Sequence, residues 1–100
     1  MEKELDRIGK RREKIREALL RLGPMRPGSL TRQYKDPQNQ VGSYYQISYT
    51  HQMKSHTEYV RPGSVRRLRR ETTEFKKFKK LIQEWIDLEI QRSKILSKQE

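Results

Sequence analysis

The chain has 100 residues, of which 31% are hydrophobic and 37% are charged, and its formal net charge is +11. A chain this short and this polar buries only a small core, which excludes an elaborate enzyme with a deep, enclosed pocket. The lack of a long apolar run excludes a membrane span, and the lack of cysteine excludes a disulfide framework and fits a reducing, cytoplasmic location.

The positive charge is concentrated in one block of the chain. Residues 61–80 hold nine basic and two acidic residues, a net charge of +7, whereas residues 81–100 hold three and four, a net charge of −1. A concentrated charge of this size attracts polyanions at long range, and nucleic acid is the default polyanion inside a cell. The distribution therefore favours a nucleic-acid partner over a purely solubilising role for the charge.

Residues 1–23 are predicted to form a helix. Its apolar residues follow the 3-4 spacing of a heptad seam, at Leu5, Ile8, Ile15, Leu19 and Leu22. Arg12 occupies the one seam position that is not apolar. Gly23 and Pro24 end the helix, because glycine takes a left-handed cap and proline cannot continue the helix. The seam is typical of one half of a packed helix pair.

Residues 28–61 are predicted to form a small antiparallel sheet. Residues 43–50 alternate as a strand should, with Tyr45 and Tyr49 on the face of Ile47 and Tyr44 on the opposite face. Residues 55–60 form the return strand of a hairpin, and residues 29–35 either add a third strand or remain a loop. A lone hairpin is marginal in water, so the sheet needs a helix on one face.

Residues 63–97 are predicted to form a long amphipathic helix. An apolar stripe runs along one side, at Leu68, Thr72, Phe75, Phe78, Ile82, Trp85 and Ile86. The opposite side carries the residues that we call the basic stripe: Arg66, Arg69, Arg70, Lys76, Lys77 and Lys80. Because Trp85 lies within the apolar stripe, we expect it to be largely buried. Towards the end of the helix Leu81, Leu88 and Ile95 broaden the apolar side, which suits a helix partner.

Together these segments predict an α+β fold with a single domain over residues 1–100. The N-terminal helix is expected to pack along the second half of the long C-terminal helix. The sheet, with two or three strands, is inserted between the two helices in sequence.

The order of these pieces resembles an uncharacterised bacterial and archaeal domain family that is found beside transposases and other mobile elements. The matching residues are Leu22–Arg26, Gly28–Leu30, Tyr34, Gly42, Tyr44–Tyr45, Ser48–Tyr49, Thr57, Tyr59–Val60, Pro62, Phe75, Phe78 and Leu81. The resemblance implies this fold and a mobile-element or nucleic-acid context, without any activity. A cysteine-rich run of the family is absent here, where residues 36–40 read Asp-Pro-Gln-Asn-Gln, so any metal or redox role of those cysteines is lost.

Catalytic chemistry is not predicted. His51 and His56 flank the hairpin turn with only Glu58 near them, the acidic residues show no paired pattern, and no glycine-rich phosphate loop is present. We therefore expect no enzyme activity, no metal and no cofactor. Tyr45 and Tyr49 are assigned to the core, whereas Tyr44 is a candidate for stacking on unpaired bases. The face of Tyr59 depends on the register of the hairpin.

The favoured hypothesis is a small, non-catalytic protein that binds nucleic acid, DNA in preference to RNA, mainly through its phosphates. The expected contact residues are the basic stripe and Tyr44. The alternative is an accessory or inhibitor subunit that docks onto a larger nucleic-acid-processing protein, such as a transposase, a nuclease or a CRISPR effector. A homodimer through the helical seams is compatible with both. No membrane partner is expected.

Overall fold

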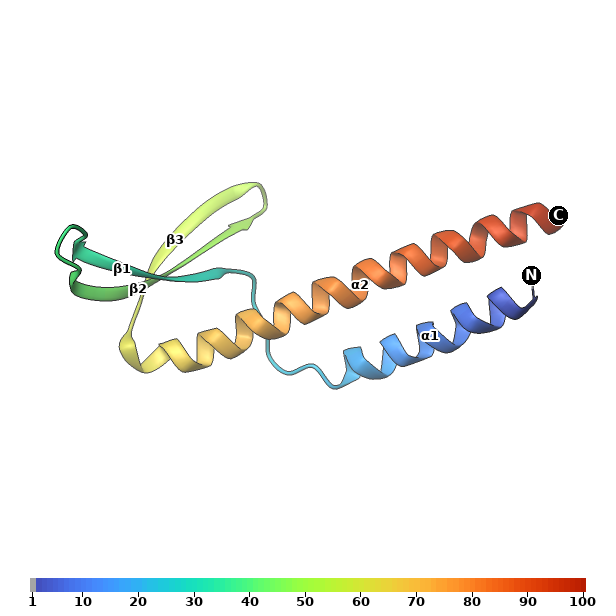
Figure 1. The fold of residues 1–100 in the computed structure, drawn as a ribbon, viewed down its shortest axis with the longest axis horizontal. Coiled ribbons are helices and arrows are strands. Elements are labelled where there is room, and N and C mark those ends of the chain that lie inside the picture. The colour runs from blue at the N-terminus through green and yellow to red at the C-terminus, as the bar shows by residue number, and fades with distance from the viewer. Residues whose placement is uncertain (1) are drawn as a thin grey trace. The chain divides into compact units, whose positions relative to one another are not determined.

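The computed structural model describes residues 2–100 and confirms the predicted α+β fold (Figure 1). Helix α1 (Glu2–Leu20) is followed by strands β1 (Ser29–Asp36), β2 (Val41–His51) and β3 (Lys54–Val60). A 3-10 turn (Pro62–Ser64) then leads into the long helix α2 (Val65–Gln99). Residues 29–36 are therefore the third strand of the sheet.

The chain divides into two compact units. The sheet unit holds residues 23–76, which comprise the sheet and the first part of α2. The helical-pair unit holds α1, the residues after it up to Leu22, and residues 77–100. That the two units unfold together as a single domain stays a prediction.

The three strands form an antiparallel sheet in the order β1–β2–β3. Leu30 pairs with Ile47, and Tyr45 pairs with Val60, so their side chains lie on one face. The hairpin between β2 and β3 turns through Gln52 and Met53, whose φ angles of 52° and 64° match a two-residue type I′ turn.

The core of the sheet unit lies between that face of the sheet and α2. Ile47, Val60 and Leu68 are buried, and Leu30, Tyr45 and Val65 pack against them. Gly28 lies so close that an added Cβ would be 2.8 Å from Cγ1 of Ile47, and its φ is +147°. Only glycine fits there, because its lack of a side chain permits both the close approach and the conformation.

Thr72 is the one buried polar residue of α2 within the described part of the chain. Its hydroxyl group donates a hydrogen bond of 2.9 Å to the carbonyl oxygen of Leu68, one turn earlier. This bond satisfies the hydroxyl without a partner from the sheet, which explains why threonine is tolerated in the predicted apolar stripe.

In the helical-pair unit, α1 runs antiparallel to the second half of α2 (Figure 1). Ile8, Ile15 and Leu88 are buried there. The partly buried residues that pack against them are Leu19, Leu81, Trp85 and Ile95. Leu81, Leu88 and Ile95, spaced seven residues apart, therefore form the side of α2 that meets α1.

Two ion pairs join the helices beside this core. Arg12, the polar residue of the α1 seam, donates a hydrogen bond from Nη1 to Oε1 of Glu89 at 2.7 Å. Arg11 donates from Nη2 to Oε1 of Glu84 at 2.8 Å and also contacts the second carboxylate oxygen. These bonds give the polar seam position a partner and fix which residues of α2 face α1.

Lowering the pH should destabilise the protein through these two carboxylates. Hydrogen bonds from Arg11 and Arg12 hold the pKa of Glu84 and the pKa of Glu89 below their ordinary value of 4.5. A depressed pKa in the folded state contributes stability that is present above the unfolded pKa and is lost as the pH falls through the folded pKa. We therefore expect the urea midpoint, followed by the fluorescence of Trp85, to fall as the pH drops through and below 4.5, the ordinary value.

The matched variant for this prediction is the double change Glu84→Gln, Glu89→Gln, which removes both titrating groups and keeps the shape of the side chains. Its urea midpoint should depend less on pH than that of the wild type. Asp36 accounts for part of the remaining slope, because hydrogen bonds from Asn39 lower its pKa as well. An unchanged slope in the double variant would contradict the assignment.

Candidate nucleic-acid interface

All six residues of the basic stripe are solvent-exposed on α2. Arg66, Arg69, Arg70 and Lys76 belong to the sheet unit, and Lys77 and Lys80 belong to the helical-pair unit. In the sheet unit the buried side of α2 holds Leu68 and Thr72, so Arg66, Arg70 and Lys76 project into solvent. Lys76 lies ten positions after Arg66, which corresponds to about 15 Å along the helix.

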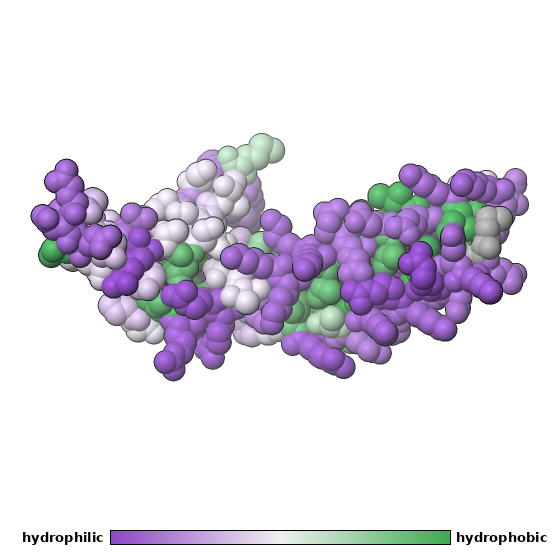
Figure 2. All heavy atoms as spheres, in the orientation of Figure 1, coloured by the Kyte–Doolittle hydropathy of each residue, from purple (hydrophilic) through white to green (hydrophobic). Residues whose placement is uncertain are grey.

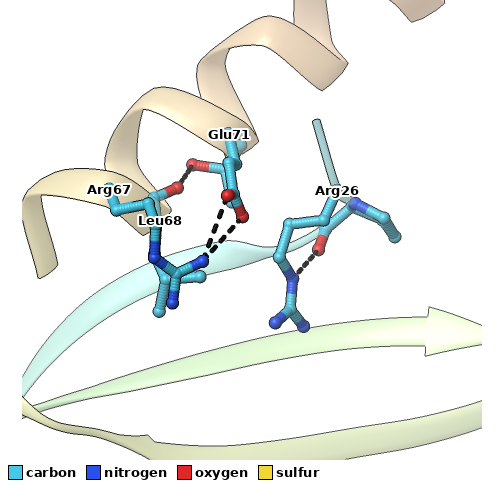
Figure 3. Close-up of polar contacts among 6 residues, drawn as sticks. Arg26, Arg67, Leu68 and Glu71 are labelled. Carbon is cyan, nitrogen blue, oxygen red and sulfur yellow. Dashed lines mark hydrogen bonds and ion pairs between the residues drawn. The ribbon is translucent and has the colours of Figure 1, made fainter. Parts of the chain in front are cut away.

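Arg67 lies among these residues in sequence but has its charge neutralised. Figure 3 shows its side chain turned toward Glu71, and Nη1 lies 3.1 Å and 3.2 Å from the two carboxylate oxygens. The backbone carbonyl of Glu71 also accepts a hydrogen bond of 3.2 Å from the amide of Arg26. Glu71 is thus held on the side of α2 that meets the segment before β1, away from the basic stripe.

Arg69 extends from the stripe to the sheet. Its guanidinium carbon lies 5.8 Å from the centre of the Tyr45 ring, a cation–π distance. Tyr45 packs against the sheet-unit core, as predicted from the alternation of β2. The contact holds one end of the arginine against an aromatic face, which limits the conformations it samples.

Tyr49 corrects one prediction from the sequence. It lies on the same face of β2 as Ile47, but it is only half-buried and belongs to a polar cluster beside the core. Its ring stacks on His56 at 4.9 Å and carries the guanidinium of Arg26 at 4.8 Å. A hydrogen bond to Glu58 raises the pKa of the Tyr49 hydroxyl. The sequence predicted the correct face of β2 for Tyr49, but the apolar core does not extend that far along the strand.

Tyr44 lies on the opposite face of the sheet, as predicted, and the register of the hairpin places Tyr59 beside it. Gln46 pairs with Tyr59, so both tyrosines point to the face opposite Ile47. Their ring centres are 6.4 Å apart. Together with Pro62 and Val65 they line a surface pocket of about 370 Å³. Tyr59 is therefore a candidate contact residue that the sequence alone left unplaced.

A second basic row, on α1, was not singled out from the sequence. Lys3, Arg7, Lys10 and Lys14 line one shallow surface with Asp6 between them. Lys10 is paired with Asp6 at 3.1 Å, which reduces the charge of the row. The spacing of these residues, every three or four positions along a helix, is the signal that could have identified them.

The two histidines lie in different surroundings. Across residues 2–100, no group of three or more His, Cys, Asp or Glu side chains is arranged to hold a metal ion. His56 is stacked on Tyr49, and His51 ends β2 opposite Lys54.

Comparison with protein-family models, curated proteins and solved structures finds no match for this chain. Over the described residues, no helix combines the length and the apolar character that crossing a membrane requires.

Proposed function

We propose that this protein is a small, non-catalytic, cytoplasmic nucleic-acid-binding protein that contacts mainly the phosphate backbone. The observation that carries the proposal is the row of exposed cations on one helix of a chain whose net charge is +11. Figure 2 shows that hydrophilic side chains cover much of the visible helix surface. Such a row matches the regular charge of a nucleic-acid backbone more than it matches any base sequence.

Ion pairs neutralise some basic residues of the protein, whereas three residues of the basic stripe have none. The positive charges of Arg11, Arg12 and Arg67 are each opposed by a glutamate within hydrogen-bond distance. Arg66, Arg70 and Lys76 have no ion pair with any of the residues from 2 to 100. Their charge is therefore available to an external polyanion, whose condensed counterions are released when the phosphates are neutralised.

A helix that carries cations favours DNA over RNA as the duplex partner. The major groove of B-form DNA admits an α-helix, whereas the major groove of A-form RNA is too deep and narrow for side chains to read. The association with a mobile genetic element rests on the resemblance described above and forms part of the same proposal.

The second candidate is an accessory or inhibitor subunit of a larger nucleic-acid-processing protein. It is favoured by one observation in the helical-pair unit, where Ile86 and Ile90 are 46% and 49% exposed. With Trp85 they line a surface pocket of about 370 Å³. Adjacent exposed apolar side chains of this kind are typical of protein contacts. A homodimer would also cover them and is compatible with either function.

The salt dependence of binding tests the proposal. Fluorescence anisotropy with a labelled duplex of random sequence should show that log K falls linearly as the logarithm of the salt concentration rises. Phosphate contacts by the four stripe residues of the sheet unit alone predict a slope of about −3.6. Absence of binding at low salt would contradict the proposal and favour the protein-partner function.

A further inference from the structure

The outer face of the sheet, opposite Ile47, differs chemically from the rest of the molecule. Strand alternation and register place only uncharged polar side chains at its centre: Thr31, Gln33, Tyr44, Gln46, Thr57 and Tyr59. The hydroxyl groups of Ser48 and Thr57 lie 3.3 Å apart on this face. No carboxylate stands on this face along the three strands that the structure describes.

Two aromatic rings stand together on this face. The Tyr44 and Tyr59 rings are 6.4 Å apart and inclined by 38°, and Tyr59 is 65% exposed. The surface pocket of about 370 Å³ lies against both rings at the edge of this face, where Ser43, Tyr45 and Val60 of the opposite face also line it. Every nucleobase has a π-face, so exposed rings that border an open hollow are suited to stacking on bases that are not paired.

The positively charged residues near this pocket indicate which class of ligand would bind there. Arg61 and Arg66 adjoin the pocket residues Pro62 and Val65 in sequence, and both are exposed. Arg69 reaches Tyr45, which lines the same pocket. Cations near a pocket that is lined by aromatic rings favour a ligand that combines flat rings with a negative backbone.

We propose that the outer face of the sheet binds single-stranded nucleic acid, with bases stacked on Tyr44 and Tyr59 and hydrogen-bonded by the neighbouring glutamines. This inference rests on the proposed function and narrows its ligand. In a duplex the bases are stacked on each other and cannot reach the rings, so a duplex engages only the cations. The protein should therefore bind a single strand more tightly than its phosphate contacts alone allow.

The test compares three labelled probes with the full-length protein by fluorescence anisotropy. The probes are a ten-nucleotide oligothymidine, an abasic oligonucleotide with the same backbone, and a duplex of the same length. Wild-type protein should bind oligothymidine more tightly than the abasic strand. Tyr44→Leu and Tyr59→Leu should each weaken binding of oligothymidine by roughly 5- to 150-fold. Binding of the abasic strand and of the duplex should be nearly unchanged.

Three further variants keep the result interpretable. Tyr34→Leu makes the same chemical change on the opposite face of the sheet and should leave the binding of oligothymidine unaltered. Tyr44→Phe and Tyr59→Phe retain the rings and should keep near-wild-type affinity, whereas a loss of fold in the leucine variants would appear in their circular dichroism spectra.

Equal affinity of the wild type for oligothymidine and the abasic strand would overturn the inference, as would an equal loss in Tyr34→Leu. In either case a salt-dependent affinity for duplex DNA would leave the proposed function intact. If none of the three probes binds at low salt, the proposed function fails together with the inference, and the face is left to a protein partner.

Discussion

Replacing Arg66, Arg70 and Lys76 together by alanine should flatten the salt dependence of duplex binding by about 2.7 units in the slope of log K against log salt. Each lost phosphate contact lowers that slope by about 0.9, and the three residues are exposed on one helix without an internal ion pair. Exposed substitutions of this kind change the free energy of unfolding by less than about 0.5 kcal/mol, so the loss reports binding rather than folding.

The control removes the same number of charges from the basic row of α1, at Lys3, Arg7 and Lys14, which are also exposed. Its slope should remain close to that of the wild type. Equal losses in the two triple variants would mean that net charge, and no particular surface, drives binding. If neither variant loses affinity, the basic stripe has no role in binding nucleic acid.

Truncation of Ile47 should produce a large loss of stability from a single change. Ile47 is 1% exposed, lies at the centre of the sheet-unit core, and contacts the Gly28 backbone closely. Ile47→Ala removes buried methyl and methylene groups and leaves a cavity, which costs about 2–5 kcal/mol of the free energy of unfolding. Urea denaturation followed by circular dichroism measures this loss.

The matched control is Val41→Ala on the same strand, where the valine side chain is 60% exposed. Its effect should stay within about 0.5 kcal/mol. The fluorescence of Trp85, which packs in the other unit, adds a second readout. If the chain unfolds as one domain, Ile47→Ala lowers the midpoint reported by Trp85 as much as the midpoint from circular dichroism. An unshifted Trp85 midpoint would show that the two units unfold separately.

The strands and helices were predictable because their signals are local. The alternation of residues 43–50 depends on neighbours in sequence, and this segment forms the expected strand. The predicted cap was wrong: α1 ends at Leu20, and Gly23 is not left-handed but donates a hydrogen bond from its amide to Oε2 of Glu74. The third strand was left open because residues 29–36 bury only part of Leu30 and Tyr34. Their pairing with β2 depends on contacts between residues distant in sequence, which periodicity does not encode.

The packing of the long helix was predictable only in part. Helical periodicity shows which side chains share a face, but it does not show which face an incoming helix covers. Leu81, Leu88 and Ile95 meet α1, whereas Ile86 of the predicted apolar stripe remains 46% exposed. Trp85 packs on the helical-pair core and is half-buried, less than predicted, because it lies at the margin of the seam.

Predicting which residues form the candidate site required the strand register more than the composition. The basic stripe could be listed from sequence because all its members lie on one helix. Tyr59 could not be placed, because shifting a hairpin by one residue moves every side chain to the other face. The turn at Gln52 and Met53 lacks the Asn-Gly signal that would have fixed the register in advance.

The sheet also has a consequence for how copies of the protein behave in solution. In a three-stranded sheet with β2 at the centre, β1 and β3 both leave one side of their backbone unpaired. Such edges can join the strands of another copy, and the mutual repulsion of chains with a net charge of +11 opposes that encounter. The range of this repulsion shrinks from about 30 Å at 0.01 M salt to about 3 Å at 1 M. Electrostatic repulsion thus keeps copies of the protein apart. We expect concentrated salt or a neutralising polyanion to let the exposed edges of different copies associate.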